Sequence, residues 1–357
     1  MRLVLRDPHT WLVMLAGGLL GLAGVMLALL GNPQNSGICV SCFLENSAGA
    51  LGLHDNARMQ YLRPELIGFV LGSTLAAVGF REFSSKGGSA PLPRLLSGVF
   101  LIVGCSVFIG CPIKLFLLLA AGDLTTLTGL LGLVGGVWLG LKGLAAGVDL
   151  GRAKKKPDGS GLWTPLLFVL LLLFLFIRPG FVLFSERGSA AEAAPILIAL
   201  GIGLLLGAAA QRTRFCVTGG LRDLMIMGMR APLFWGFIVF VLVAFAAGLA
   251  TGTFNLGFYG QPGAHLDLLW SFFGMLLVGS VSVLIGGCPF RQLIKAGEGD
   301  ADAGLVVIGM FLGAGLVQAW QIAGTAAGVP VYGKIAVVLG LAFILMNLLF
   351  FRERAAA

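Results

Sequence analysis

The segment Gly110-Cys111-Pro112-Ile113-Lys114 returns later in the chain as Gly287-Cys288-Pro289-Phe290-Arg291. An earlier segment, Gly37-Ile38-Cys39-Val40-Ser41, returns as Arg214-Phe215-Cys216-Val217-Thr218. In both cases the two cysteines are 177 residues apart, and a Gly-Asp dipeptide and two further glycines keep the same offset. Several anchors at one spacing are hard to obtain by chance, so they indicate an internal duplication.

The composition excludes an ordinary water-soluble enzyme. Of the 357 residues, 58% are hydrophobic and only 11% are charged, whereas a soluble domain carries about 25% charged residues. The net charge of +8 does not indicate nucleic-acid binding, because the basic residues lie between long apolar segments. We therefore expect the lipid bilayer as a partner and do not expect nucleic acid.

A transmembrane helix needs about 20 consecutive, mostly apolar residues. Hydropathy indicates ten such segments, at 11–31, 63–80, 95–110, 125–147, 162–178, 193–210, 231–252, 266–287, 303–325 and 331–351. They predict an all-α polytopic membrane protein with about ten spans.

The loops between these segments differ in positive charge. With the N-terminus in the cytoplasm, the cytoplasmic loops and ends hold 17 Lys and Arg residues and the opposite loops hold 6. Cytoplasmic loops carry the excess of basic residues in membrane proteins. The bias predicts a multi-pass protein of the cell (inner) membrane with both termini in the cytoplasm.

The duplication divides the chain into four parts. Residues 1–150 form a first membrane repeat, and 151–192 form a linker with one extra span. Residues 193–325 form a second repeat, and 326–357 form the last span and a cytoplasmic tail. Because an odd number of spans precedes the second repeat, we expect it to be inverted, as in many secondary transporters.

Each repeat has two interruptions of its helical pattern, and the matched cysteines lie on them. Irregular backbone at membrane depth is tolerated only where it is buried in protein or lines a cavity. Interruptions at corresponding positions of two halves are the best sequence indication of a transport site. The predicted substrate pathway therefore contains Cys39, Cys111, Cys216 and Cys288.

Thiols suit a small anion with a soft sulfur or selenium atom. A thiol is compact and polarizable, and it donates a weak hydrogen bond without the cost of burying a full charge. Basic residues beside the cysteines, namely Lys114, Arg214 and Arg291, are candidates for attracting the anion. Cys42 and Cys105 have no cysteine at the matching offset and are secondary candidates.

Other interpretations of these residues stay open. A buried free cysteine often acts only as a small apolar residue, and Lys114 and Arg291 would alternatively extend to lipid headgroups. Cys39 and Cys42 also form a C-x-x-C motif, typical of a redox pair or half a metal site. The alternative function is therefore a membrane redox or thiol relay. The sequence predicts no catalytic residue, metal site or cofactor.

The duplicated Gly-Cys-Pro anchors and the ten-span hydropathy resemble the YeeE/YedE family over residues 11–350. The resemblance implies an hourglass-like fold with short interrupted helices. It also implies a thiosulfate-type substrate that passes between pore cysteines through S–H contacts.

Cys39, Cys111 and Cys288 match the pore cysteines of the family, and Cys216 mirrors Cys39. The stretch 31–54 is most similar to a branch described as selenium transporters, while Cys42 and Cys105 depart from the thiosulfate branch. The family is often associated with cytoplasmic sulfurtransferase-like carrier proteins. The expected function is a permease, and not an enzyme, that takes up a small sulfur- or selenium-containing anion.

Overall fold

The computed structural model describes residues 7–151 and 153–350. Residues 1–6, Arg152 and residues 351–357 lie outside the described residues, and with them several of the charges used to predict the orientation. The described chain is mostly helical, with loops and two antiparallel two-residue strands, β1 (Lys86–Gly87) and β2 (Lys154–Lys155).

Every segment that hydropathy indicated as a span overlaps one long helix. These are α1 (Pro8–Leu29), α3 (Pro64–Gly79), α4 (Pro91–Phe108), α6 (Thr126–Ala145), α7 (Trp163–Ile177), α8 (Ile196–Thr213), α10 (Pro232–Ala250), α11 (Leu268–Ile285), α13 (Ala301–Ala319) and α14 (Val331–Phe350).

Eight apolar helical segments of the described chain are long enough to cross a membrane. The helices α3 and α7 have 16 and 15 residues, which corresponds to lengths of about 24 and 22 Å. The predicted all-α polytopic class is confirmed.

Four short helices interrupt this pattern, each directly after a matched cysteine. They are α2 (Val40–Ala50), α5 (Pro112–Ala120), α9 (Val217–Met227) and α12 (Pro289–Gly297). Two single-turn 3-10 helices, η2 (Asp158–Gly161) and η3 (Gly228–Arg230), lie in loops.

Local chemistry explains why these short helices begin where they do. Pro112 and Pro289 occupy the first turn of α5 and α12, where a missing N–H costs nothing. The preceding helices end at the matching residues Ile109 and Gly286, which have left-handed φ angles of 62° and 80°. A left-handed residue ends a helix and redirects the chain.

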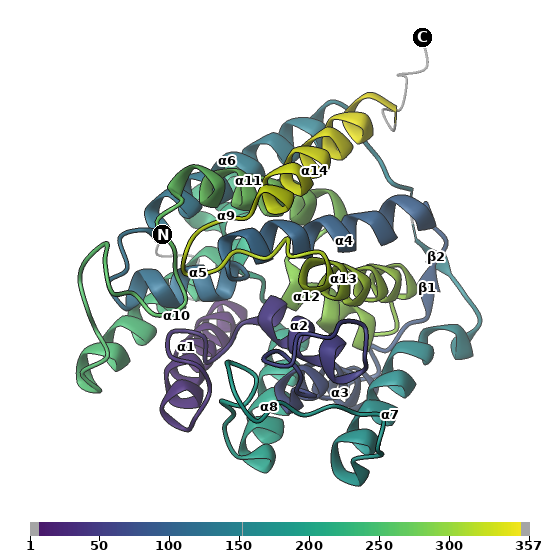
Figure 1. Ribbon diagram of the computed structural model, residues 1–357. Helices are drawn as coiled ribbons and strands as arrows, with labels where there is room; N and C mark the ends of the chain where they lie inside the picture. Colours follow the sequence, from purple (N-terminus) through teal and green to yellow (C-terminus); the bar gives the residue numbers. More distant parts are fainter. Residues whose placement is uncertain (1–6, 152, 351–357) are drawn as a thin grey trace.

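Each long helix of one half packs along a long helix of the other half, and the pairs are related by the internal repeat. The helix α3 packs along α8, and α1 packs along α10 (Figure 1). Likewise, α4 packs along α13, and α6 packs along α11. Because α1, α3, α4 and α6 correspond to α8, α10, α11 and α13 in sequence order, each contact has a counterpart in the other half.

Glycines allow two of these pairs to approach closely. A Cβ atom on Gly132 would lie 2.1 Å from the carbonyl oxygen of Phe272 in α11. A Cβ atom on Gly309 would lie 2.1 Å from the carbonyl oxygen of Leu95 in α4. The two glycines are 177 residues apart, so matching positions carry the same helix-packing role.

Candidate functional site

In the second half, two of the predicted cysteines lie side by side. Cys216 and Cys288 precede α9 and α12, and their Sγ atoms are 3.6 Å apart. The Cys216 Sγ atom also accepts a hydrogen bond from the backbone N–H of Gly219 at 3.3 Å and contacts the hydroxyl of Thr218 at 3.3 Å. Both thiols are buried, so this pair lies inside the helical packing rather than against lipid.

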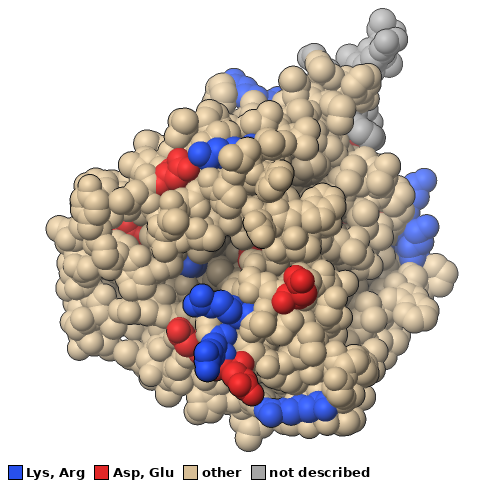
Figure 2. Space-filling view, in the orientation of Figure 1, with Lys and Arg blue, Asp and Glu red and all other residues tan. Residues whose placement is uncertain are grey.

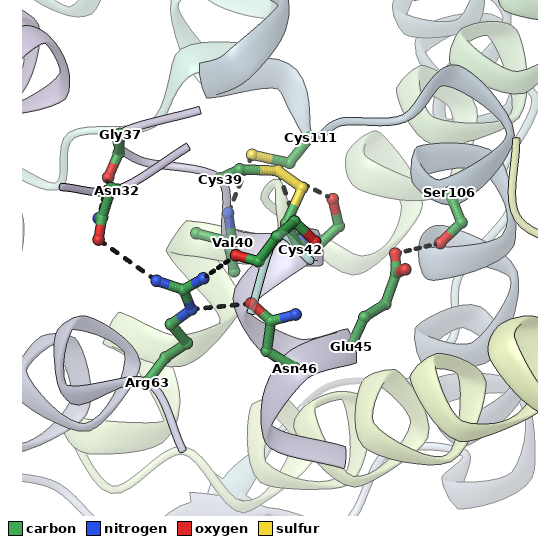
Figure 3. Close-up of a disulfide and its surroundings, with 12 residues drawn as sticks. Asn32, Gly37, Cys39, Val40, Cys42, Glu45, Asn46, Arg63, Ser106 and Cys111 are labelled. Carbon is green, nitrogen blue, oxygen red and sulfur yellow. Dashed lines mark hydrogen bonds between the residues drawn. A yellow bond between two sulfur atoms is a disulfide. The ribbon is translucent and has the colours of Figure 1, made fainter. Parts of the chain in front are cut away.

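In the first half, Cys39 and Cys42 form a disulfide beside a third cysteine, Cys111 (Figure 3). Cys111 Sγ accepts a hydrogen bond from the backbone N–H of Val40 at 3.3 Å. Because Val40 is the first residue of α2 and Cys111 directly precedes α5, this bond joins the N-terminal ends of the two short helices. Cys39 and Cys111 are buried, and Cys42 is partly exposed.

The short helices also contact each other between the halves. The helix α5 contacts α9, and α12 contacts α2. Together with the hydrogen bond from Val40 to Cys111 and the sulfur contact between Cys216 and Cys288, these contacts connect all four short helices. Helix N-termini carry partial positive charge and free N–H groups, and a cysteine precedes each of these four.

A cavity of about 970 Å³ lies beside the first-half cysteines. Loops line its wall, at 33–36, 56–59, 188–192, 262–264 and 321–326. Figure 2 shows Lys and Arg side chains gathered with Asp and Glu side chains around a hollow on one face of the molecule. The side chains that line the cavity include Cys42, Glu45, Arg63, Ser106 and Lys114.

Lys114 is a buried cation that lines this cavity. Its side chain belongs to the first turn of α5 and is only 2% exposed. Among the described residues, its ammonium group has no hydrogen bond and no ion pair. Gly263, whose φ of 75° favours glycine, lies close to this amine, since a Cβ atom there would be 2.8 Å from Lys114 Nζ.

Arg63 is a second buried cation at the cavity. Its guanidinium donates to Asn46 Oδ1 at 2.8 Å, to Asn32 Oδ1 at 3.3 Å and to the carbonyl oxygen of Ser189 at 2.9 Å. All three acceptors are neutral. Asn32 also donates to Glu65 Oε1 at 2.7 Å, which links the two charges through an amide. Figure 3 shows Arg63 with Asn32 and Asn46 beside the disulfide.

Glu45 is the buried carboxylate of the same cavity, only 5% exposed. Its Oε1 atom accepts a hydrogen bond from the Ser106 hydroxyl at 2.6 Å, and its Oε2 atom accepts one from the Gln318 amide. The first hydrogen bond is visible in Figure 3. No basic side chain of the described chain forms an ion pair with Glu45.

The other two predicted basic residues have carboxylate partners. Arg291 pairs with Glu298 at 3.0 Å, and both side chains are buried. Arg214 pairs with Glu298 at 2.8 Å and with Glu82 at 3.3 Å. Arg291 is the repeat counterpart of Lys114, but only Lys114 faces a cavity without an ion-pair partner.

Sequence reasoning missed several residues of this region. Glu45, Gln318 and Glu298 have no acidic or amide counterpart at the 177-residue offset, so the repeat gave no signal for them. The one available signal for Glu45 was a charged residue inside the otherwise mostly apolar stretch 38–51. Cys105, a secondary candidate, is fully buried within α4.

Comparisons with known proteins agree with the resemblance stated above. A family described as "Sulphur transport" matches residues 212–350. The "Thiosulfate transporter TsuA" of Escherichia coli (strain K12) is 34% identical over 107 residues, which are 29% of this chain and 29% of that protein. The "Probable transporter YedE" of Escherichia coli (strain K12) is 27% identical over 150 residues, 41% of this chain and 34% of that protein.

These matches confirm the resemblance to the YeeE/YedE family. They span about a third of the length of the curated relatives. The family match begins two residues before Arg214, so it includes Cys216, Cys288 and Arg291.

Proposed function

We propose that this chain is a membrane permease for a small sulfur- or selenium-containing anion, which passes along a route lined by Cys39, Cys111, Cys216 and Cys288. One observation carries the proposal. Contacts and hydrogen bonds connect four short helices, each preceded by a matched cysteine, and two of them, α2 and α5, line a cavity that contains Lys114, which has no ion pair among the described residues. Its support from relatives is the match to a sulfur transport family and to a thiosulfate transporter.

The chemistry of thiosulfate fits this arrangement. Its oxygen end carries charge that a buried ammonium stabilises, and its terminal sulfur is soft enough to accept hydrogen bonds from the free thiols of Cys111, Cys216 and Cys288. Burying an unpaired charge is costly, so the anion and Lys114 stabilise each other in the cavity. The N–H groups at the short helix N-termini add further favourable charge.

The direction of uptake follows from the predicted topology. With both termini in the cytoplasm and the two repeats inverted, the cavity opens to the outside. Cys39 and Cys111 then receive the anion, and Cys216 and Cys288 deliver it toward the cytoplasm of an inner-membrane protein. A sulfurtransferase-like carrier protein is the proposed acceptor on that side.

Uptake of radiolabelled thiosulfate into proteoliposomes tests the function. We expect Cys111→Ala and Cys288→Ala each to reduce the initial rate at least about tenfold, because each removes a thiol donor from the route. Cys105→Ala is the matched control, since it removes an equally buried thiol that lies within α4 and does not precede a short helix. Normal uptake in both test variants, with the protein folded, would end the proposal.

A redox relay through Cys39 and Cys42 is the second candidate, and their disulfide favours it. A relay requires both cysteines and changes its thiol content with each turnover. A permease keeps most of its flux in Cys42→Ala. Counting free thiols before and after transport separates the two functions.

A further inference from the structure

We infer that Glu45 binds a proton together with the transported anion, which makes the chain a proton–anion symporter. The inference rests on the proposed permease function and adds the source of energy for uptake. It is carried by the position of a buried carboxylate, without an ion-pair partner, in the cavity that contains Lys114.

Charge at this cavity explains why a proton would accompany the anion. A negative carboxylate repels an incoming anion, and this repulsion is weakly screened in a buried site. Protonation of Glu45 removes the repulsion and leaves the positive charges of Lys114 and Arg63 to attract the anion. Linkage is reciprocal, so a bound anion must favour protonation of Glu45 by the same factor.

The hydrogen bonds of Glu45 suit both charge states. In the ionised state, Glu45 Oε1 accepts from Ser106 and Oε2 accepts from Gln318. A hydroxyl both donates and accepts, so Ser106 can rotate and accept from a protonated Oε1. The Gln318 amide is held by Asn56, which donates to Gln318 Oε1 at 2.8 Å. The proton is therefore assigned to Oε1, on the Ser106 side.

Several neighbouring elements place charged or titratable groups near Glu45. Lys114 lies on α5, Arg63 and Glu65 lie at the start of α3, and Cys105 lies on α4. His54, in the loop after α2, contacts the backbone carbonyl of Glu45 at 2.9 Å.

More distant charges of the neighbouring helices are already paired or hydrogen-bonded. On α12, Arg291 pairs with Glu298 and Lys295 pairs with Asp300. On α13, Asp302 accepts hydrogen bonds from Gly88 and Ser89. Glu45 is therefore the carboxylate of the described cavity wall that is both buried and free of a cation partner.

A co-transported proton reduces the electrical work of moving an anion into the cell. An interior-negative potential opposes the entry of an anion, and each accompanying proton cancels one elementary charge. The proton moves from external water to Glu45 as the anion binds, and it leaves to the cytoplasmic side with the anion. No covalent bond of the protein or of the anion changes.

The test measures thiosulfate accumulation in proteoliposomes under an imposed inward proton gradient, with the membrane potential clamped by valinomycin and potassium. One pH unit is a tenfold ratio of proton activity, so coupling to one proton gives about tenfold accumulation. In Glu45→Gln we expect the accumulation ratio to fall to about one, while exchange of internal and external thiosulfate continues. Glu192→Gln, which removes an exposed carboxylate from the same cavity, is the matched control and should accumulate thiosulfate like wild type.

A second measurement uses only the wild-type protein. A pH-sensitive dye inside the vesicles should report acidification when thiosulfate is added outside without a proton gradient. Thiosulfate flux with no acidification and no effect of the gradient would overturn the symport and leave the permease function standing. The same holds if Glu45→Gln still accumulates thiosulfate. Absence of thiosulfate flux in every protein would overturn both.

Discussion

Each half of this molecule contains two short helices at matching positions, but the cysteines and basic residues beside them differ in their partners. In the first half, Cys39 and Cys42 are joined, and Lys114 faces a cavity without an ion-pair partner. In the second half, Cys216 and Cys288 are thiols in contact, and Arg291 pairs with a buried carboxylate. The shared scaffold positions the cysteines, whereas a few unmatched residues make the surroundings of the two cysteine sites different.

One of these unmatched residues is Glu298, which neutralises Arg291 and Arg214. Glu298 and Ala121 follow α12 and α5 directly, and they are 177 residues apart. The first half therefore lacks the carboxylate that would pair with Lys114. A buried cation without a counter-ion is unfavourable for stability, and this is the basis of the proposal that Lys114 binds the anion.

Removal of Glu298 should give the largest effect on stability. Glu298→Ala leaves the buried Arg291 without its partner, and we expect the free energy of unfolding to fall by about 3 kcal/mol. Unfolding by increasing SDS in mild detergent measures this change. Lys114→Gln, at the position that matches Arg291, breaks no ion pair of the described residues and should lower stability much less. Equal losses in the two variants would contradict the difference between the halves.

Lys114 should instead control affinity. In Lys114→Gln we expect the KM for thiosulfate uptake to rise about tenfold or more, because the buried positive charge is lost. Ala121→Glu transfers the partner of Arg291 into the first half and should weaken uptake in the same way. An unchanged KM in both variants would show that Lys114 does not bind the anion.

The sequence predicted the scaffold well, for physical reasons. Hydropathy located all ten long helices, because each needs a continuous apolar stretch. The 177-residue offset also indicated the four cysteines that precede the short helices. It could do so because local sequence, such as Pro112 and Pro289, sets where a short helix begins.

The pairing of polar side chains was not predictable, because it joins residues that are far apart in sequence. Glu45 meets Gln318 across 273 residues, and Arg63 meets Ser189 across 126. The repeat gave no guide to these contacts, since neither Glu45 nor Arg63 has a counterpart of the same kind. Local spacing likewise suggested that Lys114 and Arg291 act alike. In the structure only Arg291 of these two forms an ion pair, because Glu298 lies beside it.

The smallest expected effect concerns the ion pairs near the end of α8. The Gln211 amide, which donates to Glu82 at 2.7 Å, lowers the pKa of Glu82 below its usual value, and Arg212 and Arg214 add to this effect. Because its pKa is lowered in the folded protein, ionised Glu82 stabilises the fold at any pH above the ordinary pKa of a glutamate. This stabilisation is lost as the pH falls through the lowered pKa.

Melting temperatures across the acidic range test this contribution. Wild type should be slightly more stable than Glu82→Gln near neutral pH, and the difference should vanish in acid. A difference that persists unchanged at low pH would contradict the assignment. The effect should be small because Glu82 is exposed to solvent screening.

The most direct test of the cysteine route is to locate the selenium atom of a bound thiosulfate analogue in the protein. Selenosulfate is an analogue of thiosulfate whose selenium atom is visible by anomalous X-ray diffraction. The account predicts selenium peaks within about 4 Å of the Sγ atoms of Cys111 and Cys288, in crystals of protein shown to transport the analogue. Selenium bound only at other places, with these sulfur atoms uncontacted, would contradict it.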